Sequence, residues 1–549
     1  MAVTEGILSR RPAHDAAART HAHALPVVPV RARGLTIEAA DGRRYLDCLS
    51  GSGTLALGHN HPVVLEAIRA VLDSGAPLHV PDLASPVRDA FLAELDQTLP
   101  PGLSGQARVR FCGPSGTDAV GAALALVRAA SGRPGVLAFP GACHTTCGGP
   151  VFPGHGAATA AAAPEAPGMC PPYPRDCRCL FGAGGAGGAG GAGGVGGAEL
   201  DSRRAESVLD DRVCGAPAPA AVILEAVQAD GVHPAPDAWL RRMRQITADR
   251  SIALVADETE SGLGRTGTFW AVEHSGVSPD VIVSRAVGGS LPLAVVVSRD
   301  DLDSGDRATP GGAFRGNQLA MAAGAATLAH VRENRLAERA ARLGARILAR
   351  LGVLKEEFAC VGDVRGRGLM IGVEMVEPGD RPEPGTLSPV LPCGPGTAAD
   401  PGADGGHRPS RGAGAATRAA AAHAAFPPSH EGGGRTAAAA AAAAADVRPA
   451  GGAEVAADED AAAAAALAPA PGLAIAVRRE CLRRGLLVGL AGRHGNVVRL
   501  LPPLTLTDEQ ASAVLDRLVD ALQSVARGPL VRDHSGRRTQ RADGPGSPG

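Results

Sequence analysis

Lysine is almost absent from this chain of 549 residues. Of its 54 basic residues only one, Lys355, is a lysine, and all the others are arginine. An arginine side chain stays protonated and offers no amine for nucleophilic chemistry or for carrying a proton. A site that needs an amine therefore has only Lys355 to supply it, and that residue falls on a predicted helix of a smaller domain.

A long apolar run and an excess of charge are also lacking. No stretch of about 18 apolar residues occurs, which excludes a membrane-spanning helix, and residues 1–20 lack the apolar core of a signal peptide. The 54 basic and 56 acidic residues give a net charge of −2, which argues against binding nucleic acid through bulk charge. The sequence predicts a soluble cytoplasmic protein without a membrane or nucleic-acid partner.

The eleven cysteines are scattered. Only Cys170, Cys177 and Cys179 cluster, and their spacing lacks the second CxxC pair or the nearby histidine pair of a zinc site. We interpret them as reduced thiols rather than metal ligands, and we expect no metal and no disulfide framework.

Low-complexity segments interrupt the chain. Segments 154–168, 182–198 and 378–468 are rich in Ala, Gly and Pro, so they cannot bury enough apolar surface to offset the entropy lost on ordering. We exclude them from the fold, which leaves about 425 residues, enough for a large two-domain enzyme. The polar tail 528–549 is also predicted to be disordered.

Apolar runs alternate with amphipathic stretches between these segments, which is typical of a mostly parallel sheet covered by helices. The runs are continuous rather than alternating, as strands buried on both faces require. The predicted strands are 108–111, 135–139, 221–225, 252–256, 281–284 and 293–298. One predicted helix begins at 236, and four more span 317–334, 336–354, 472–484 and 508–526. The strand-like segments 368–376 and 496–504 indicate a smaller C-terminal α+β domain.

Unusual residues follow several of these strands, where α/β sheets bind ligands. Ser115, Gly116 and Thr117 form a Gly-rich turn before a helix, whose N-terminus favours an anion, although such a turn alone is more often a plain helix cap. Asp257 and Glu258 end a buried strand, where a carboxylate needs a cation such as a protonated ring nitrogen, or else serves as a cap for the next turn.

Two arginines, Arg285 and Arg499, are also candidate site residues. Arg285 lies just past a strand, and it fits either a ligand site or a structural ion pair with a strand-end acid. Arg499 stands in an apolar run before two prolines, where a guanidinium is suited to binding a carboxylate through two hydrogen bonds.

Together these loops resemble the class III pyridoxal-phosphate (PLP) aminotransferases of fold type I, and they are most similar to the diaminobutyrate–2-oxoglutarate transaminases. The matching segments run in the family's order and include FCGPSGTDAVGAALALV, DETESGLGRTGTFWAVEHSGVSPDVIVSRAVGG, FRGNQLAMAAGAATL and GNVVRLLPPLT. The resemblance implies a homodimer with PLP sites at the subunit interface. It also implies an N-terminal part of a small α+β domain (1–64), a large PLP-binding domain (65–334) and a C-terminal part of the small domain (335–527).

The resemblance further assigns roles to site residues. The turn 115–117 would hold the cofactor's phosphate, and Asp257 would face the pyridine nitrogen and keep it protonated. Arg499 would bind the α-carboxylate of the 2-oxo acid, and Glu225 would pair with Arg499 when that carboxylate is absent.

Several site positions depart from the family's pattern. SRAVGG stands where the family has SKAIGG, so Arg285 replaces the lysine that forms a Schiff base with PLP and carries the proton. Glu260 puts a carboxylate where a neutral amide normally touches the cofactor's phenolic oxygen, so two anions would repel. Cys143 and His144 are both implied cofactor contacts, and Cys143 replaces an aromatic ring that would stack on the cofactor. Ala313 lacks the hydroxyl that the neighbouring subunit would offer to the phosphate.

Two functions are therefore predicted. The first is a PLP-dependent transaminase for 2,4-diaminobutyrate (or a similar ω-amino acid) and 2-oxoglutarate, with turnover severely impaired by Arg285. The alternative is a non-catalytic relative that binds PLP or its amine form without a covalent bond, or that dimerises with an active paralogue. A chain-wide drift from lysine to arginine would also account for Arg285.

Overall fold

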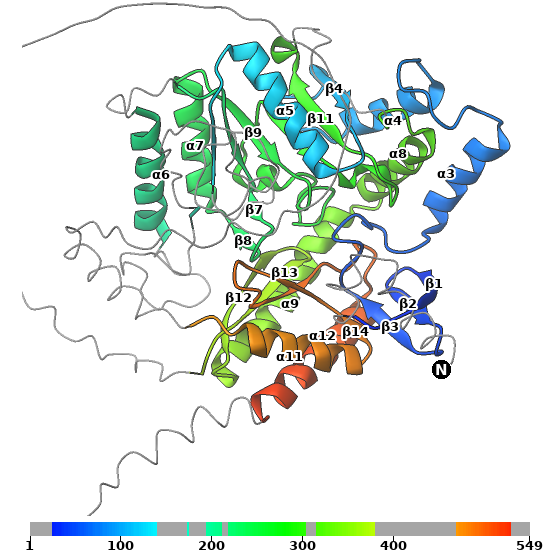
Figure 1. Ribbon diagram of the computed structural model, residues 1–549, viewed down its shortest axis with the longest axis vertical. Helices are drawn as coiled ribbons and strands as arrows, with labels where there is room; N and C mark the ends of the chain where they lie inside the picture. Colours follow the sequence, from blue (N-terminus) through cyan, green and yellow to red (C-terminus); the bar gives the residue numbers. More distant parts are fainter. Residues whose placement is uncertain are drawn as a thin grey trace, which may run out of the picture. The chain divides into compact units, whose positions relative to one another are not determined.

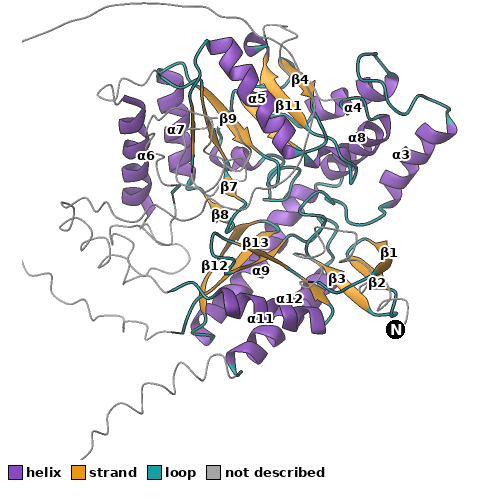
Figure 2. Ribbon diagram, in the orientation of Figure 1, coloured by secondary structure: helices purple, strands orange, loops and turns teal. Residues whose placement is uncertain are grey.

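The computed structural model describes residues 25–139, 173–174, 194–210, 218–303, 314–378 and 468–528. All of them belong to one compact unit, Met1–Asp380 with Ala461–Gly549. Within these residues the strands form one six-stranded sheet, two four-stranded sheets and a two-stranded ribbon, with helices packed against them (Figures 1 and 2). No helix within the described ranges has the length and apolar character needed to cross a membrane.

The six-stranded sheet contains the strands predicted from the apolar runs. Its order is β4-β11-β10-β9-β6-β5, in which β10, β9, β6 and β5 are mutually parallel and β11 is antiparallel to both of its neighbours. The strands are β4 (Ala107–Phe111), β5 (Val136–Ala138), β6 (Ala221–Leu224), β9 (Ala253–Asp257), β10 (Val281–Ser284) and β11 (Val295–Arg299). The predicted α/β class with a mostly parallel central sheet is confirmed.

Strand β4 departs from the expectation that every strand is buried on both faces. It lies at the edge of the sheet, and its Arg108 and Arg110 form ion pairs with Asp300 and Asp303, which follow β11. An edge strand has one unpaired side near solvent, so it tolerates charged side chains that an inner strand does not. The inner strands β6 and β10 are buried along their whole length.

Helices cover both faces of this sheet. Helix α5 (Gly116–Ser131) packs on β10 and β11, and α7 (Asp237–Asp249) packs on β9 with α6 (Gly194–Asp210) against it. Helix α8 (Gln318–Glu333) contacts α3 (Pro62–Asp73) and α4 (Pro86–Asp96). The start of α6 corrects the sequence analysis, because residues 194–198 of the excluded segment 182–198 are helical and lead into an amphipathic stretch.

The other sheets are built from the N-terminal and C-terminal parts of the chain. Strands β1 (Pro29–Arg33), β2 (Thr36–Ala39) and β3 (Arg44–Asp47) are antiparallel, and β14 (Leu486–Leu487) pairs with β3 in parallel. The second sheet has the order β12-β13-β16-β15. Its strands are β12 (Val361–Arg367), β13 (Met370–Met375), β16 (Val497–Leu500) and β15 (Gly489–Ala491), and the helices beside it are α9 (Leu336–Glu357), α11 (Pro471–Arg483) and α12 (Asp508–Ala526). The proposed domain boundaries stay predictions.

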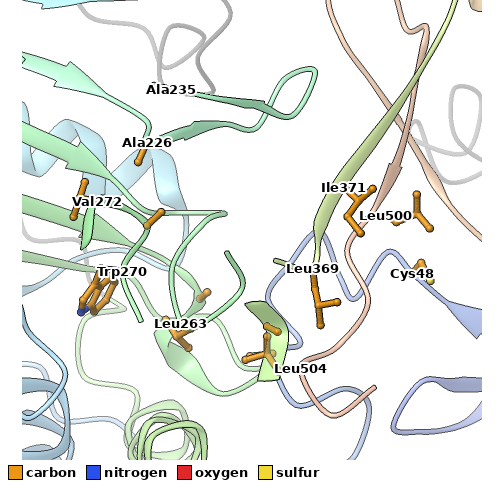
Figure 3. Close-up of a cluster of buried hydrophobic side chains, with 14 of the residues drawn as sticks. Cys48, Ala226, Ala235, Leu263, Trp270, Val272, Leu369, Ile371, Leu500 and Leu504 are labelled. Atoms are coloured by element: carbon orange, nitrogen blue, oxygen red, sulfur yellow. The ribbon is translucent and has the colours of Figure 1, made fainter. Parts of the chain in front are cut away.

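One apolar core connects the central sheet with these C-terminal strands. Leu263 and Trp270 from the loop after β9 belong to the same buried cluster as Ile371 on β13 and Leu500 on β16 (Figure 3). This core joins the loop after β9 to β16. It therefore fixes the relative positions of the polar residues on those two segments.

Candidate functional site

A cavity of about 520 Å³ opens at the carboxyl ends of β9 and β10, beside the N-terminus of α5. Ligands of α/β sheets bind at this edge, and the volume is that of a small-molecule site. The lining contains many of the residues that the sequence singled out. They are Ser115, Gly116, Thr117, Asp257, Glu260 and Arg285, with Ser52, Thr54, Pro114, Val120, Thr259, Ser290, Leu291 and Pro292.

A larger cavity of about 610 Å³ has a different character. Its charged residues already neutralise one another, since Asp280 accepts hydrogen bonds from Arg244 at 2.7 Å and from Arg299 at 2.8 Å. The lining holds none of the site residues predicted from the sequence. We therefore place the functional site in the cavity at the ends of β9 and β10.

The start of α5 forms one wall of that cavity. Ser115 caps the helix: its Oγ accepts a hydrogen bond from the Asp118 N–H at 3.2 Å and donates to the Asp118 carboxylate at 2.7 Å. Ser115 is thus the N-cap residue of α5. The dipole of this helix favours an anion at the same end. The turn therefore combines a cap with the properties of an anion site.

Strand β9 ends in two carboxylates with different surroundings. Asp257 is 2% exposed, lines the cavity and accepts a hydrogen bond from the Thr259 N–H at 3.0 Å. Glu258 is fully buried and accepts hydrogen bonds from the Ser261 hydroxyl at 2.6 Å and the Val272 N–H at 2.9 Å. Burial raises the pKa of Glu258 to about 7. Of the two carboxylates, Asp257 is the one placed to face a cation in the cavity.

Glu260, which lines the cavity, bridges Arg285 and Arg499. Its Oε1 accepts a hydrogen bond from Nη2 of Arg285 and its Oε2 accepts one from Nη1 of Arg499, each at 2.8 Å. Nη2 of Arg285 also donates to the carbonyl oxygen of Ser52 at 3.1 Å. The three charged side chains are 11 to 22% exposed, so water screens their attraction less than on an open surface. The structural ion pair considered for Arg285 is confirmed, with Glu260 as its acid.

Arg265 is a site residue that the sequence reasoning missed. Its fully buried guanidinium donates to the carbonyl oxygens of Pro502 at 3.0 Å and Gly53 at 2.9 Å. The pKa of Arg265 is lowered to about 10, chiefly by desolvation and also by the nearby Arg499, while Glu260 partly opposes both effects. Arg265 is the one charged residue in segment 261–272, and that isolation is the signal that was available.

The expected pairing of Glu225 with Arg499 is corrected by the structure. The carboxylate that contacts Arg499 within the described residues is Glu260, whereas the Glu225 carboxylate accepts a hydrogen bond from the Ala229 N–H at 2.8 Å. Glu225 thus holds the ribbon of β7 (Val227–Gln228) and β8 (His233–Pro234), whose Ala229 carbonyl receives Nη1 of Arg499 at 3.4 Å. Glu260 reaches Arg499 because the core joins its loop to β16.

Three predicted cofactor contacts, Cys143, His144 and Ala313, lie outside the described residues. The cysteine cluster 170–179 lies outside them as well. In the part of the chain that the structure describes, no group of three or more His, Cys, Asp or Glu side chains is arranged to hold a metal ion.

Comparison with known proteins places this site in a family. The class-III aminotransferase family matches residues 16–151 and 200–388. The diaminobutyrate–2-oxoglutarate aminotransferase of Rhizobium meliloti is 38% identical over 524 residues, which cover 95% of this chain and 93% of that protein. The enzyme of the same name from Haemophilus influenzae is 41% identical over 381 residues, covering 69% of this chain and 81% of its own length.

Solved structures agree with this fold. An amine transaminase from an uncultivated Pseudomonas species has a TM-score of 0.64 and 24% identity, over 90% of this chain and 94% of its own. The ornithine delta-aminotransferase of Plasmodium falciparum has a TM-score of 0.63 and 19% identity, over 96% of this chain and 99% of its own. From the family match and the long alignments to its relatives, the chain belongs to the class-III aminotransferases, which use PLP as cofactor.

Proposed function

We propose that the cavity is a transaminase site for PLP, 2-oxoglutarate and an ω-amino acid such as 2,4-diaminobutyrate, with turnover severely impaired by Arg285. The substrate class is supported by the names of the relatives from Rhizobium meliloti and Haemophilus influenzae. The impairment rests on one observation, namely that the first residue after β10 in the cavity wall is an arginine held by Glu260.

The cavity fits the phosphate and the ring of PLP. The N-terminus of α5, at residues 115–117, would take the phosphate, and the buried carboxylate of Asp257 would face the protonated ring nitrogen. When bound, PLP supplies a ring that accepts electrons from the substrate. The Asp257 carboxylate would keep that nitrogen protonated, because a cation beside a buried carboxylate offsets part of the cost of burying its charge.

The cavity does not fit the covalent attachment of PLP. On the proposed alignment Arg285 stands in place of the Schiff-base lysine, and a guanidinium has neither a free lone pair nor a proton to give up. Lys355 cannot replace it, because it lies on α9 and contacts Asp363 at 3.4 Å. We therefore propose that PLP binds without a covalent bond, and we derive no catalytic step through it.

Arg499 is the proposed site for the carboxylate of the 2-oxo acid. Its guanidinium is fixed by β16 and the Ala229 carbonyl, and the buried Arg265 is near enough to interact with it electrostatically. Glu260 contacts Arg285 and Arg499, so together with Arg265 these groups carry more positive than negative charge and favour an anion.

A second candidate function is a non-catalytic relative that binds PLP or its amine form, or dimerises with an active paralogue. The engagement of Arg285 with both Glu260 and the Ser52 carbonyl favours it, since these contacts give Arg285 a structural role. We propose a homodimer for either function, supported by the exposed apolar side chains of Leu83 and Phe314 near the paired residues His79 and Asn317.

Borohydride reduction of the full-length protein with PLP tests the proposal. A covalent imine would be fixed to the chain and appear in the peptide mass spectrum, whereas we expect unmodified peptides and complete loss of PLP on dialysis. A pyridoxyl adduct on a side chain of the cavity would refute the proposal. Glutamate formation from 2,4-diaminobutyrate and 2-oxoglutarate then separates the two functions, because the impaired enzyme retains slow turnover and the non-catalytic relative has none.

A further inference from the structure

The fully buried guanidinium of Arg265 joins two segments beside the cavity that are far apart in the chain. Its Nη2 donates a hydrogen bond to the carbonyl oxygen of Gly53 at 2.9 Å, and its Nη1 donates one to that of Pro502 at 3.0 Å. Resting on the function proposed above, we propose that Arg265 is a positioning residue, which clamps loop 50–54 to the segment after β16 and so fixes one wall of the PLP cavity.

The chemistry of Arg265 fits a clamp better than an ordinary ion pair. Within the described part of the chain, its side-chain hydrogen bonds go to main-chain carbonyl oxygens rather than to a carboxylate. Removing a guanidinium from water is costly, and an apolar side chain would fill the same space without that cost. A guanidinium, however, presents several N–H groups in a rigid planar fork. That fork can hold carbonyl oxygens of two separate segments at once.

Loop 50–54 has a backbone conformation that needs an anchor. All four residues 50–53 have a positive φ, between 45° and 88°. Two of them are serines, for which this conformation is unfavourable and persists only where the surrounding structure imposes it. The carbonyl that Arg265 binds belongs to the residue between Ser52 and Thr54, and both of these line the cavity. The clamp therefore acts directly on the cavity wall.

The second segment is the one that carries Arg499. Pro502 lies two residues beyond β16, the strand that contains Arg499. Main-chain hydrogen bonds of 2.7 and 2.8 Å join 48–56 to 501–504 on either side of the clamp, and Figure 3 shows side chains of both segments in one apolar cluster. Arg265 thus fastens the middle of a loop whose two ends are already tied to the same segment.

The clamp also reaches Arg285. The carbonyl of Ser52, next to the clamped Gly53, accepts a hydrogen bond from Nη2 of Arg285 at 3.1 Å. The aliphatic part of Arg285 lies beside Gly116, since a Cβ at Gly116 would be 3.0 Å from its Cδ. Arg265 therefore helps to set the position of a side chain that lies between loop 50–54 and the turn proposed to take the phosphate.

A pair of arginine variants of the full-length protein tests the clamp, with PLP as the probe. Arg265→Gln removes it, and Arg133→Gln is the control, because Arg133 also donates to carbonyls of two segments, at Pro219 and Ser251, away from the cavity lining. We expect Arg265→Gln to weaken PLP binding in titration calorimetry about tenfold. It should also speed backbone amide hydrogen exchange in 48–56, and Arg133→Gln should do neither.

A pair of glycine variants tests the loop without changing Arg265, and it decides the question where Arg265→Gln fails to fold. Gly53 and Gly42 have similar φ values of +88° and +79°, and a Cβ would meet no atom closer than 3.7 Å at Gly53 and none within 4 Å at Gly42. Both Gly→Ala changes should therefore lower the Tm alike through backbone strain. A merely structural loop would show only that change, whereas we expect Gly53→Ala alone to weaken PLP binding well below the Tm.

Hydrogen exchange in the PLP-free protein separates this inference from the proposed function. Unchanged exchange of 48–56 in Arg265→Gln would overturn the clamp, whether or not PLP binds. Faster exchange with unchanged PLP affinity in Arg265→Gln and Gly53→Ala would overturn the positioning role and leave the proposed function standing. A wild type that binds no PLP would overturn the proposed function, while faster exchange of 48–56 in Arg265→Gln would still support the clamp.

Discussion

The buried carboxylate of Glu258 makes a strong prediction about stability. It lies between Asp257 and Glu260, and its hydrogen bonds to Ser261 and the Val272 N–H hold the loop that carries both site residues. Burial raises its pKa from the ordinary value of 4.5 to about 7. Replacing it by glutamine, which has nearly the same shape as a protonated glutamate, removes the titration.

The sign and the size of the effect follow from the pKa. Because the pKa is higher in the folded chain, protonation of Glu258 stabilises the fold. That contribution is complete below pH 4.5 and is lost as the pH rises through 7. A shift from 4.5 to about 7 corresponds to about 3 kcal/mol. We expect Glu258→Gln to equal the wild type in acid and to exceed it by up to about 3 kcal/mol in base.

Urea unfolding at about pH 4 and about pH 8.5, on either side of the sequence pI of 6.8, measures this difference. Trp270 is fully buried next to the loop and serves as the fluorescent probe. Glu94→Gln, whose carboxylate is not buried in the core, should show no comparable change with pH. The reasoning is refuted if wild type and Glu258→Gln differ equally at both pH values, because the hydrogen bonds would then fully offset the cost of burial.

Three further predictions concern the site. Arg285→Lys alone should give little borohydride-fixed PLP, since Glu260 would keep the new amine protonated, whereas adding Glu260→Gln should restore it; equal adducts in both variants would exclude this coupling. Ser115→Ala should cost about 1 kcal/mol through loss of the cap and weaken phosphate binding, and unchanged melting and titration would contradict this. Gly289 has a φ of +57°, and Gly289→Ala would place a Cβ against the Ala323 carbonyl oxygen of α8, so the Tm should fall. Gly121→Ala, whose Cβ would have nothing within 4 Å, is the control, and equal Tm values would contradict the clash.

The central sheet could be predicted from the sequence because its inner strands are apolar on both faces. Segment 281–284, for example, is a continuous apolar run that matches β10 at both ends. The N-terminal strands β1, β2 and β3 were not predicted, because they mix charged and apolar residues and remain partly exposed. The pairing of β3 with β14 joins segments far apart in the chain, which local periodicity does not reveal.

The site could be located from the sequence, but its pairings could not be assigned. Strand ends predicted the positions of Asp257 and Arg285, because parallel strands end at one edge of the sheet. Arg499 was predicted instead from its place in an apolar run before two prolines, and it lies within β16 of another sheet. Which acid meets Arg499 depends on the path of the loop after β9, and the structure selects Glu260 where the resemblance indicated Glu225. That path is set by the apolar core, whose contacts are long-range.

The ion pair between Arg285 and Glu260 bears on how both residues came to occupy the cavity. On the proposed alignment, a chain-wide drift from lysine to arginine accounts for Arg285 but not for Glu260, since such a drift does not turn a neutral amide into a carboxylate. In the cavity wall each charge supplies the partner of the other at 2.8 Å, and removing either one leaves a half-buried charge less well paired. Glu260 beside a lysine would already hold that amine in its charged, unreactive form. If the proposed alignment holds, the carboxylate would therefore hinder covalent chemistry at this position, and the arginine would add a second, independent block.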